Sequence, residues 1–396
     1  MTDQAAGVVL MGTKVTSTHR TLCDLVAKQS LPDDDYNHHM PLTSMKFSQS
    51  RSTYNHFVDI VDHYLEATVG NRGPFQTKNL KRHWEYILLH LSRGVLLRHW
   101  TVVALKKGAY TNDYWLNRYD LSHTYIKLIV EFLQDRGLIE LLQGKRYNDK
   151  PMRTRIFATP QLAASLLPLA LDAEQPIEPP YITINNPEDE WGEVIADLPD
   201  DHPALVTMIK INEFLKEHEW ACKGPVRAAY KHSPFEGGRL ITAFQNLPDK
   251  KIRLRINTRI DGKPICEVDF NANHLRLNLA DIAGEDAGDT PYEDIMEIAG
   301  ISERQQVKDF ITRAMGSIKR SDALGACHKE GISNKQFEII EQATLKRYPK
   351  LSLFSGFGMH AQNIEGQILK QVMLDGVDKG IVALPVHDAV AVVQGN

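Results

Sequence analysis

Two aspartates, Asp269 and Asp388, stand where a carboxylate would bind a divalent metal ion. Asp269 follows a short apolar stretch that predicts a strand, and a helical sequence comes directly after it. Asp388 lies between two apolar segments, residues 381–386 and 389–393, which predict a β-hairpin with the carboxylate at its tip. Because an unpaired carboxylate is costly to bury, a compensating cation is expected at Asp388, and the end of a buried strand before a helix is a suitable position for a metal-binding Asp269. Taken singly, Asp269 would also serve as a helix N-cap and Asp388 as a turn residue.

A basic stretch precedes the first of these aspartates. Residues 225–263 contain nine Lys or Arg and only three Asp or Glu. Positive charge at this density favours a polyanion lying alongside, such as a nucleic-acid backbone. Considered alone, the stretch is better explained as an exposed hairpin whose charges are solvated.

Four segments, in this order, resemble the motifs of family A DNA polymerases and the related single-subunit RNA polymerases. Gly238-Arg239-Leu240 with Gln245-Asn246-Leu247-Pro248 is similar to the segment T-G-R-L…P-N-L-Q-N-I-P of that family. Residues 269–276 resemble motif A (D-Y-S-Q-I-E-L-R), and residues 302–319 resemble motif B, which begins R-x-x-x-K. Val386-His387-Asp388 resembles motif C, V-H-D-E or V-H-D-S.

The resemblance covers about residues 235–393 and is most similar to divergent phage or prophage members of the group. Ahead of motif C, residues 364–370 are similar to the helix I-Q-G-T…I-L-K of the family. Any one of these motifs is weak, whereas four in the right order are fairly specific. The resemblance implies an α+β fold with a compact palm and fingers domain.

The resemblance implies a template-directed nucleotidyltransferase with two metal ions. Asp269, Asp388 and the backbone carbonyl of Phe270 would bind two Mg²⁺, for which Mn²⁺ is a substitute. Such metals activate the primer 3′-OH and neutralise the triphosphate. The implied partners are a DNA primer–template and (d)NTPs.

The resemblance also implies a nucleotide site on the motif B helix. Arg304 and Lys308 are four residues apart on one helical face and would bind the triphosphate, and Lys308 would protonate the leaving group. His274 would contact the nucleotide sugar. Residues 302–305 also predict a capping box that begins this helix. Contacts with the primer and template would come from a larger set: Arg239, Gln245, Asn246, Arg253, Arg255, Arg276 and His387.

The chain departs from the family pattern at several places. His274 replaces the Glu that excludes a ribose 2′-OH, which leaves the choice of sugar open. The surrounding pattern is nearer to the DNA polymerases, so a DNA polymerase is favoured, with a primase or RNA polymerase as the alternative. Motif B lacks the Phe and Tyr that follow its Lys, and Thr312 and Met315 stand near those positions. Ala389 follows the motif C aspartate, and the chain ends a few residues later, which is the pattern of a fragment.

The N-terminal part of the sequence predicts a winged-helix domain. One helix has an apolar stripe, and a second begins near Ser122 and ends at Gly137, which is typical of a left-handed C-terminal cap. Strands are predicted at residues 138–142 and 154–159, with a polar turn between them. The stripe of the first helix consists of Trp84, Ile87, Leu88 and Leu91, and that of the second of Ile126, Ile129, Val130 and Leu133.

A DNA-binding surface is predicted on the second helix and the wing. The helix would enter the major groove and the wing cations would meet phosphates. The alternative is a solvated surface on a protein-binding module. The DNA-contacting set is Thr124, Lys127, Lys145, Arg146 and Arg153, with His123 also facing outward and Lys150 and Arg155 on or beside the wing.

The chain is predicted to divide into four parts. They are a mobile tail (1–45), the winged-helix domain (46–170), an acidic, proline-containing linker (171–203) and the polymerase domain (204–396). The linker assignment rests on ten Asp or Glu and no Lys or Arg.

The remaining features of the sequence restrict the class of protein. The four cysteines, Cys23, Cys222, Cys266 and Cys327, show no C-x-x-C spacing, and no apolar run reaches the ~20 residues of a membrane helix. A cytoplasmic protein without a membrane partner is therefore expected, and its oligomeric state is open. A replication initiator or a DNA-binding regulator with a degenerate palm is a further alternative.

Overall fold

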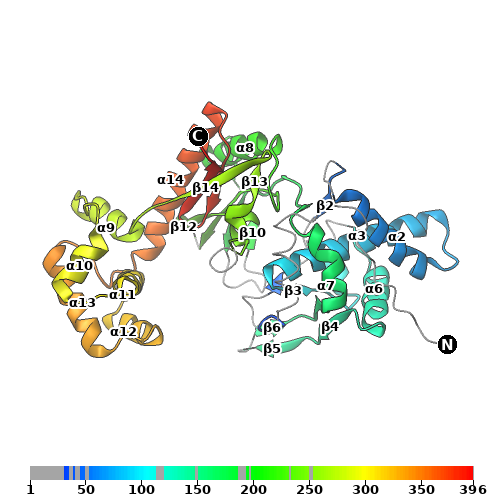
Figure 1. Ribbon diagram of the computed structural model, residues 1–396, viewed down its shortest axis with the longest axis horizontal. Coiled ribbons are helices and arrows are strands. Elements are labelled where there is room, and N and C mark those ends of the chain that lie inside the picture. The colour runs from blue at the N-terminus through cyan, green and yellow to red at the C-terminus, as the bar shows by residue number, and fades with distance from the viewer. Residues whose placement is uncertain are drawn as a thin grey trace. The chain divides into compact units, whose positions relative to one another are not determined.

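The computed structural model describes ten stretches of the chain. They are residues 31–34, 39–40, 45–49, 53–112, 120–147, 150–185, 193–195, 198–231, 233–248 and 253–395. Residues 1–30, the larger part of the expected tail, lie outside these stretches. The chain forms two compact units, one of Met1–Glu178, Lys216–Pro225 and Ala243–Ile265 and the other of Pro179–Leu215, Val226–Thr242 and Cys266–Asn396. Both units contain helices and strands, which confirms the α+β class (Figure 1).

The first unit is built on helices and a small sheet with the order β1-β3-β7-β4. β7 pairs antiparallel with both β3 and β4, and the hairpin β5–β6 lies between β4 and β7 in the chain. Its elements are β1 (His39–Met40), β2 (Lys46–Phe47), α2 (Tyr54–Val69), α3 (Pro74–Leu97), β3 (Trp100–Val102), α4 (Ala109–Asn112), α6 (His123–Asp135), β4 (Ile139–Leu142), β5 (Lys145–Tyr147), β6 (Lys150–Met152), β7 (Arg155–Ala158), α7 (Pro160–Leu166), β8 (Ala173–Glu174) and β13 (Arg259–Ile260).

The two predicted helices of this unit are confirmed, and so are the strands after them. Every member of the two predicted apolar stripes, on α3 and α6, is at most 1% exposed. Ser122 holds the N-cap position of α6, although its side chain makes no capping bond. Gly137 follows the helix with φ +62°, and Leu138 N–H donates to the Leu133 carbonyl, as in a Schellman ending.

A buried histidine joins the two helices. His83 on α3 is 1% exposed, and its Nδ1 lies 2.6 Å from the Asn79 carbonyl oxygen. Its Nε2 accepts the backbone N–H of Ser122, at the start of α6, at 2.8 Å. Burial is the main cause that lowers the His83 pKa from 6.5, so the neutral ring that these bonds require is the stable form.

The second unit contains two sheets and a group of helices. One sheet has the order β10-β9-β11-β12, and the other places β16 between β14 and β15. Its elements are β9 (Ile182–Asn185), β10 (Glu193–Ile195), α8 (Pro203–Lys216), β11 (Arg227–Lys231), β12 (Ser233–Ile241), β14 (Lys263–Asp269, which enters from the first unit), α9 (Asn273–Ala283), α10 (Pro291–Ala299), α11 (Arg304–Gly316), α12 (Arg320–Lys329), α13 (Asn334–Arg347), α14 (Gly358–Lys379), β15 (Ala383–Val386) and β16 (Ala389–Val393).

The structure differs from the predicted linker over part of residues 171–203. Ala173–Glu174 pairs with β2, and β9 pairs in parallel with β11. A parallel pair needs a crossover, and α8 supplies it. The acidic composition of the segment therefore does not prevent it from contributing strands to both units.

Helix α14 crosses β12 at two glycines. A Cβ on Gly366 would lie 2.2 Å from the carbonyl oxygen of Gly238, so the helix and strand backbones touch there. Gly238 itself has φ +82°, and a Cβ on it would lie 2.6 Å from a ring carbon of Tyr230. Within the second unit, α14 extends from this sheet to the group of helices α9 to α13 (Figure 1).

No helix in the ten described stretches is long and apolar enough to cross a membrane.

Candidate active site

The two predicted aspartates lie on neighbouring strands of the second unit. Asp269 is the last residue of β14, and Asp388 is the second residue of a two-residue turn between β15 and β16. β14 and β16 are adjacent in the sheet. The strand and hairpin predictions are therefore confirmed. The N-cap of α9 is Ala272, so Asp269 is not a helix cap.

Asp269 experiences the charges of Asp388 and Lys308. Burial, followed by the Asp388 carboxylate, raises the Asp269 pKa above 3.8, while Lys308 and the Phe270 backbone N–H act to lower it. Three residues from three separate motifs, on β14, the β15–β16 turn and α11, thus meet in one electrostatic environment. Neighbouring carboxylates repel each other, and a divalent cation bound to both would remove the repulsion.

The donor set fits a hard metal ion that retains other oxygen ligands. Among the described residues, no group of three or more His, Cys, Asp or Glu has the geometry of a metal site. Two carboxylates would therefore share the coordination of any metal with water, a backbone carbonyl or substrate oxygens. That pattern is usual for Mg²⁺, which keeps several waters and is held by one or two carboxylates.

The backbone beside both carboxylates adopts an uncommon conformation. Ala272, three residues after Asp269, has φ +53°, and His387, directly before Asp388, has φ +56°. Positive φ is unfavourable for residues other than glycine and is enriched at functional sites. The same local feature thus accompanies each of the two predicted metal-binding carboxylates.

Arg304 and Lys308 lie on the exposed side of α11. The opposite side is fully buried and includes Val307, Phe310 and Ile311. Within the described residues Lys308 forms no ion pair, and its charge reaches Asp269. The prediction that both cations share one helical side is confirmed.

Arg304 is held by three neighbours. Its Nε donates to Glu293 at 2.7 Å, its Nη2 donates to the Asn271 side-chain oxygen at 2.9 Å, and its guanidinium carbon lies 4.9 Å from the Tyr292 ring centre. The hydrogen bond from Arg304 is the largest cause that lowers the Glu293 pKa from 4.5. A triphosphate that binds Arg304 would have to compete with the Glu293 carboxylate.

The capping box predicted at residues 302–305 is wrong. Glu303 holds the N-cap position of α11, and no side chain caps the helix. Gln306 instead donates to the Glu303 carboxylate at 2.8 Å. A capping box does occur at α13, where the Ser333 hydroxyl accepts the Gln336 backbone N–H and Gln336 accepts the Ser333 N–H. The two sequences share the same pattern, so only the local backbone distinguishes them.

His274 contacts a buried carboxylate that the sequence did not mark as functional. Its Nε2 lies 3.7 Å from Glu365 Oε2, and Asn273 donates to the same oxygen at 2.9 Å. Glu365 is 3% exposed, and its Oε1 has no hydrogen-bond partner among the described residues. The resemblance aligned Glu365 with a Gln of the family helix and gave no reason to select it.

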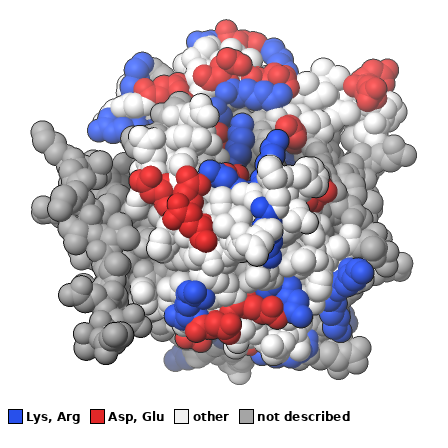
Figure 2. Space-filling model, turned by 90° about the vertical axis from the view of Figure 1, so that its right-hand side faces the viewer, with Lys and Arg blue, Asp and Glu red and all other residues white. Residues whose placement is uncertain are grey.

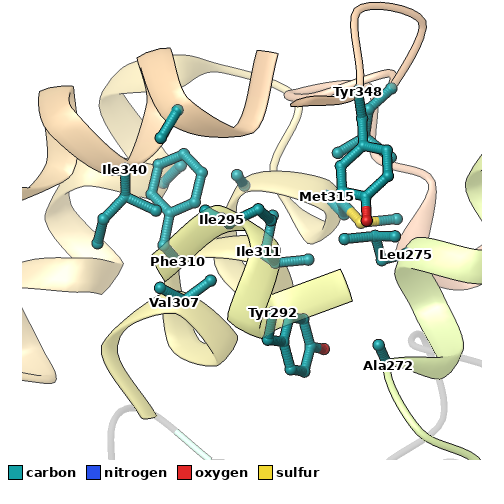
Figure 3. Close-up of a cluster of buried hydrophobic side chains, with 14 of the residues drawn as sticks. Ala272, Leu275, Tyr292, Ile295, Val307, Phe310, Ile311, Met315, Ile340 and Tyr348 are labelled. Atoms are coloured by element: carbon teal, nitrogen blue, oxygen red, sulfur yellow. The ribbon is translucent and has the colours of Figure 1, made fainter. Parts of the chain in front are cut away.

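Tyr292 was also missed. It lies in the first turn of α10, beneath Arg304, and burial raises its pKa to about 12, with Asp388 and Asp269 adding to the shift. Its ring belongs to a hydrophobic cluster formed by α9, α10, α11 and α13 (Figure 3). No motif of the family includes this segment, and an aromatic residue that follows a proline is usually interpreted as part of the hydrophobic core.

The predicted primer–template residues divide between the two units. Arg239, Arg276 and His387 lie in the second unit, and Gln245, Asn246, Arg253 and Arg255 lie in the first. Arg276 donates to the backbone carbonyls of Asn271 at 2.8 Å and Gly288 at 2.5 Å, so it holds the loop that follows Asp269.

Arg255 is buried rather than presented to a ligand. It is 9% exposed and donates to the carbonyls of Gln245 and Leu247, each at 3.1 Å. The prediction that it contacts nucleic acid is wrong in this conformation, because its donors stabilise a turn. Asn246, Arg253 and His387 are exposed, whereas Arg239 is half-buried.

The predicted DNA-contacting residues of the first unit differ in exposure. Thr124 and Lys127 are exposed on α6, with Lys127 3.5 Å from Glu131, and Arg153 is half-buried. Lys145 forms an ion pair with Asp34. The side chain of Arg146 lies outside the described residues. Basic and acidic side chains are interspersed on the face in Figure 2.

Two further residues of that prediction point inward. His123 Nε2 lies 3.0 Å from the Leu105 carbonyl oxygen, and its ring packs against Tyr110. Arg155 is 1% exposed and pairs with Asp34. Burial acts to raise the Asp34 pKa, but Lys145 and Arg155 together lower it below 3.8. His123 and Arg155 thus belong to the internal structure of the unit.

Comparison of the chain with protein families, with characterised proteins and with solved structures gave no match.

Proposed function

We propose that the second unit is a template-directed nucleotidyltransferase, with a DNA polymerase as the preferred form. The observation that carries the proposal is the convergence of Asp269, Asp388 and Lys308, which come from three sequence motifs, with Asp388 and Lys308 both acting on the Asp269 pKa. A structural role gives no reason to place two repelling carboxylates beside a lysine that has no ion-pair partner among the described residues.

Each residue then has a definite task. Asp269 and Asp388 would hold two Mg²⁺, which when bound lower the pKa of the primer 3′-OH and neutralise the phosphates. Lys308 would neutralise the triphosphate and give a proton to the departing pyrophosphate. Arg304 would exchange Glu293 for a phosphate, which forms charge-assisted bonds with the same guanidinium.

Incorporation of labelled nucleotides tests the proposal. Wild-type protein with Mg²⁺ is expected to extend a primed DNA template, and Asp388→Ala is expected to abolish extension. Asp378→Ala is the matched control, because Asp378 is an exposed carboxylate on α14 that pairs with Lys210. Extension that survives in Asp388→Ala, or that is absent from wild type with every template, contradicts the proposal.

The same assay separates the related polymerase classes. If dNTPs and rNTPs are offered on primed and unprimed templates, a DNA polymerase is expected to incorporate dNTPs, and only when a primer is present. Preference for rNTPs without a primer would instead identify a primase or RNA polymerase. His274, which replaces the Glu of the family at the sugar, is the residue on which this choice would depend.

The first unit is proposed as a winged-helix domain that binds duplex DNA. The order α3, β3, α4, α6, β4, hairpin, β7, with β7 paired between β3 and β4, supports this second function. Binding to duplex DNA that persists in a protein without polymerase activity would favour a replication initiator or a regulator. The exposed Thr124 and Lys127 on α6 are its best candidates for groove contact.

A further inference from the structure

Tyr292 combines a buried ring with a hydroxyl that leaves the core. The residue is 4% exposed, and its ring packs in the hydrophobic cluster near Ile295 and Ile311. In Figure 3 the hydroxyl points away from those side chains, toward the side on which Ala272 lies. Ala272 follows Asp269 by three residues, so the hydroxyl faces the segment that carries the first carboxylate.

The hydroxyl of Tyr292 has no hydrogen-bond partner among the described residues. Tyr348, in the same cluster, shows the usual arrangement, because its hydroxyl donates to the Ala287 carbonyl at 2.8 Å. A tyrosine hydroxyl next to a core normally finds such a partner. The donor of Tyr292 is therefore available to a ligand.

The charges around Tyr292 define what that ligand would be. Arg304 lies over its ring at 4.9 Å, and Asp269 and Asp388 are close enough to influence its titration. With a pKa of about 12, the hydroxyl keeps its proton at neutral pH. It thus offers a neutral donor next to a cation, which suits an anionic oxygen that the cation also attracts.

We propose that Tyr292 is a further substrate-contacting residue, whose hydroxyl donates a hydrogen bond to the polyphosphate of the incoming nucleotide. The proposal rests on the nucleotidyltransferase function proposed above. The ring of Tyr292 supports Arg304 while its hydroxyl binds the same phosphate group. An aromatic residue on α10 thus adds to the nucleotide site of α11, whose own motif lacks the Tyr of the family.

The variant Tyr292→Phe tests this by removing only the hydroxyl. Because a hydrogen bond to a charged group is worth about 1.5–3 kcal/mol, nucleotide incorporation is expected to slow about 10- to 150-fold. The Tm should stay at the wild-type value, since no bond within the described protein is lost. Tyr348→Phe is the matched control: it should lower the Tm, because it loses the bond to Ala287, and leave the incorporation rate unchanged.

Equilibrium binding to full-length protein identifies the contact. Tyr292→Phe is expected to weaken binding of a deoxynucleoside triphosphate and to leave binding of the corresponding monophosphate unchanged. An equal loss for both ligands, or a wild-type incorporation rate in Tyr292→Phe, overturns the proposal while the polymerase function stands. Wild-type protein that incorporates no nucleotide overturns both.

Discussion

At the scale of single residues, the charged Asp269 side chain is expected to lower the stability of the folded state, although the proposed reaction requires it. Its pKa is raised, chiefly by burial and by Asp388, so the folded state disfavours the charged form. Asp269→Asn should therefore raise the Tm at neutral pH and abolish nucleotide incorporation. The gain in Tm should disappear as the pH falls below 3.8, where folded and unfolded chains both hold the proton. Asp378→Asn, which loses an ion pair with Lys210, should give no gain; an equal rise in both variants would contradict the interpretation.

Lys308 should act mainly on the chemical step. Lys308→Ala is expected to lower kcat on the order of 100-fold, because a general acid contributes at least that much, and to change duplex affinity little. Lys335→Ala is the control, since Lys335 is an exposed lysine on α13. Single-turnover incorporation and duplex titration measure the two effects. An unchanged kcat in Lys308→Ala removes this residue from the active site.

The residues of the candidate site differ in how far the sequence could predict them. Asp269, Asp388 and Lys308 belong to motifs whose order is visible, and the structure brings them together. Tyr292 and Glu365 could not be predicted, because their roles depend on which helices pack against the carboxylate strands. The local sequence around Tyr292, an aromatic residue after a proline, or around Glu365, a glutamate within a helix, does not indicate that the carboxylate strands lie nearby.

At the scale of elements, removing a serine hydroxyl is expected to affect stability at the start of α13 but not at the start of α11. Ser333→Ala should lower the free energy of unfolding by about 1 kcal/mol, because its hydroxyl caps α13. Ser302→Ala should leave it nearly unchanged, since that hydroxyl does not cap α11. Chemical denaturation of the two variants measures the difference. A larger loss in Ser302→Ala would show that the sequence pattern was the better guide.

The His83 connection between α3 and α6 makes stability depend on pH. The pKa of His83 in the folded state lies below 6.5, so as the pH falls the unfolded chain binds a proton more readily than the folded chain does. The free energy of unfolding should therefore fall as the pH drops through 6.5, by at most about 1.4 kcal/mol per pH unit from this group. His83→Gln cannot titrate and should remove that part of the slope. Denaturation curves of both proteins from pH 7.5 to pH 5 provide the comparison, with identical slopes as the opposing result.

At the scale of the whole molecule, the first unit should govern binding to duplex DNA. Lys127→Ala with Arg153→Ala in the full chain should weaken binding evenly across sequences and reduce the slope of log affinity against log salt by about one per lost phosphate contact. Glu131→Ala is the matched control, because it frees Lys127 from its acidic neighbour and should not weaken binding. Affinity that does not depend on salt would favour a protein-binding role for this unit.

The sequence could predict the α+β class and several elements that carry the motifs, such as α6, α11 and the β15–β16 hairpin, because apolar periodicity is a local signal. It could not predict that the chain passes between the units more than once, since strand pairing such as that of β9 with β11 joins distant segments. Nor could it show that Arg155 and Arg255 are buried, because a cation in a basic stretch looks exposed until its partners are known.

The crossing of α14 over β12 has a consequence for any survey of variants across the chain. Gly238 and Gly366 lie in two of the segments that resemble polymerase motifs, yet packing alone requires both: a side chain on Gly366 would meet the β12 backbone, and one on Gly238 would meet the Tyr230 ring. Selection for growth or activity should deplete substitutions at these glycines as severely as at the aspartates. Depletion in those segments would therefore report backbone packing as much as catalysis, and only soluble yield measured alongside activity would tell the two apart.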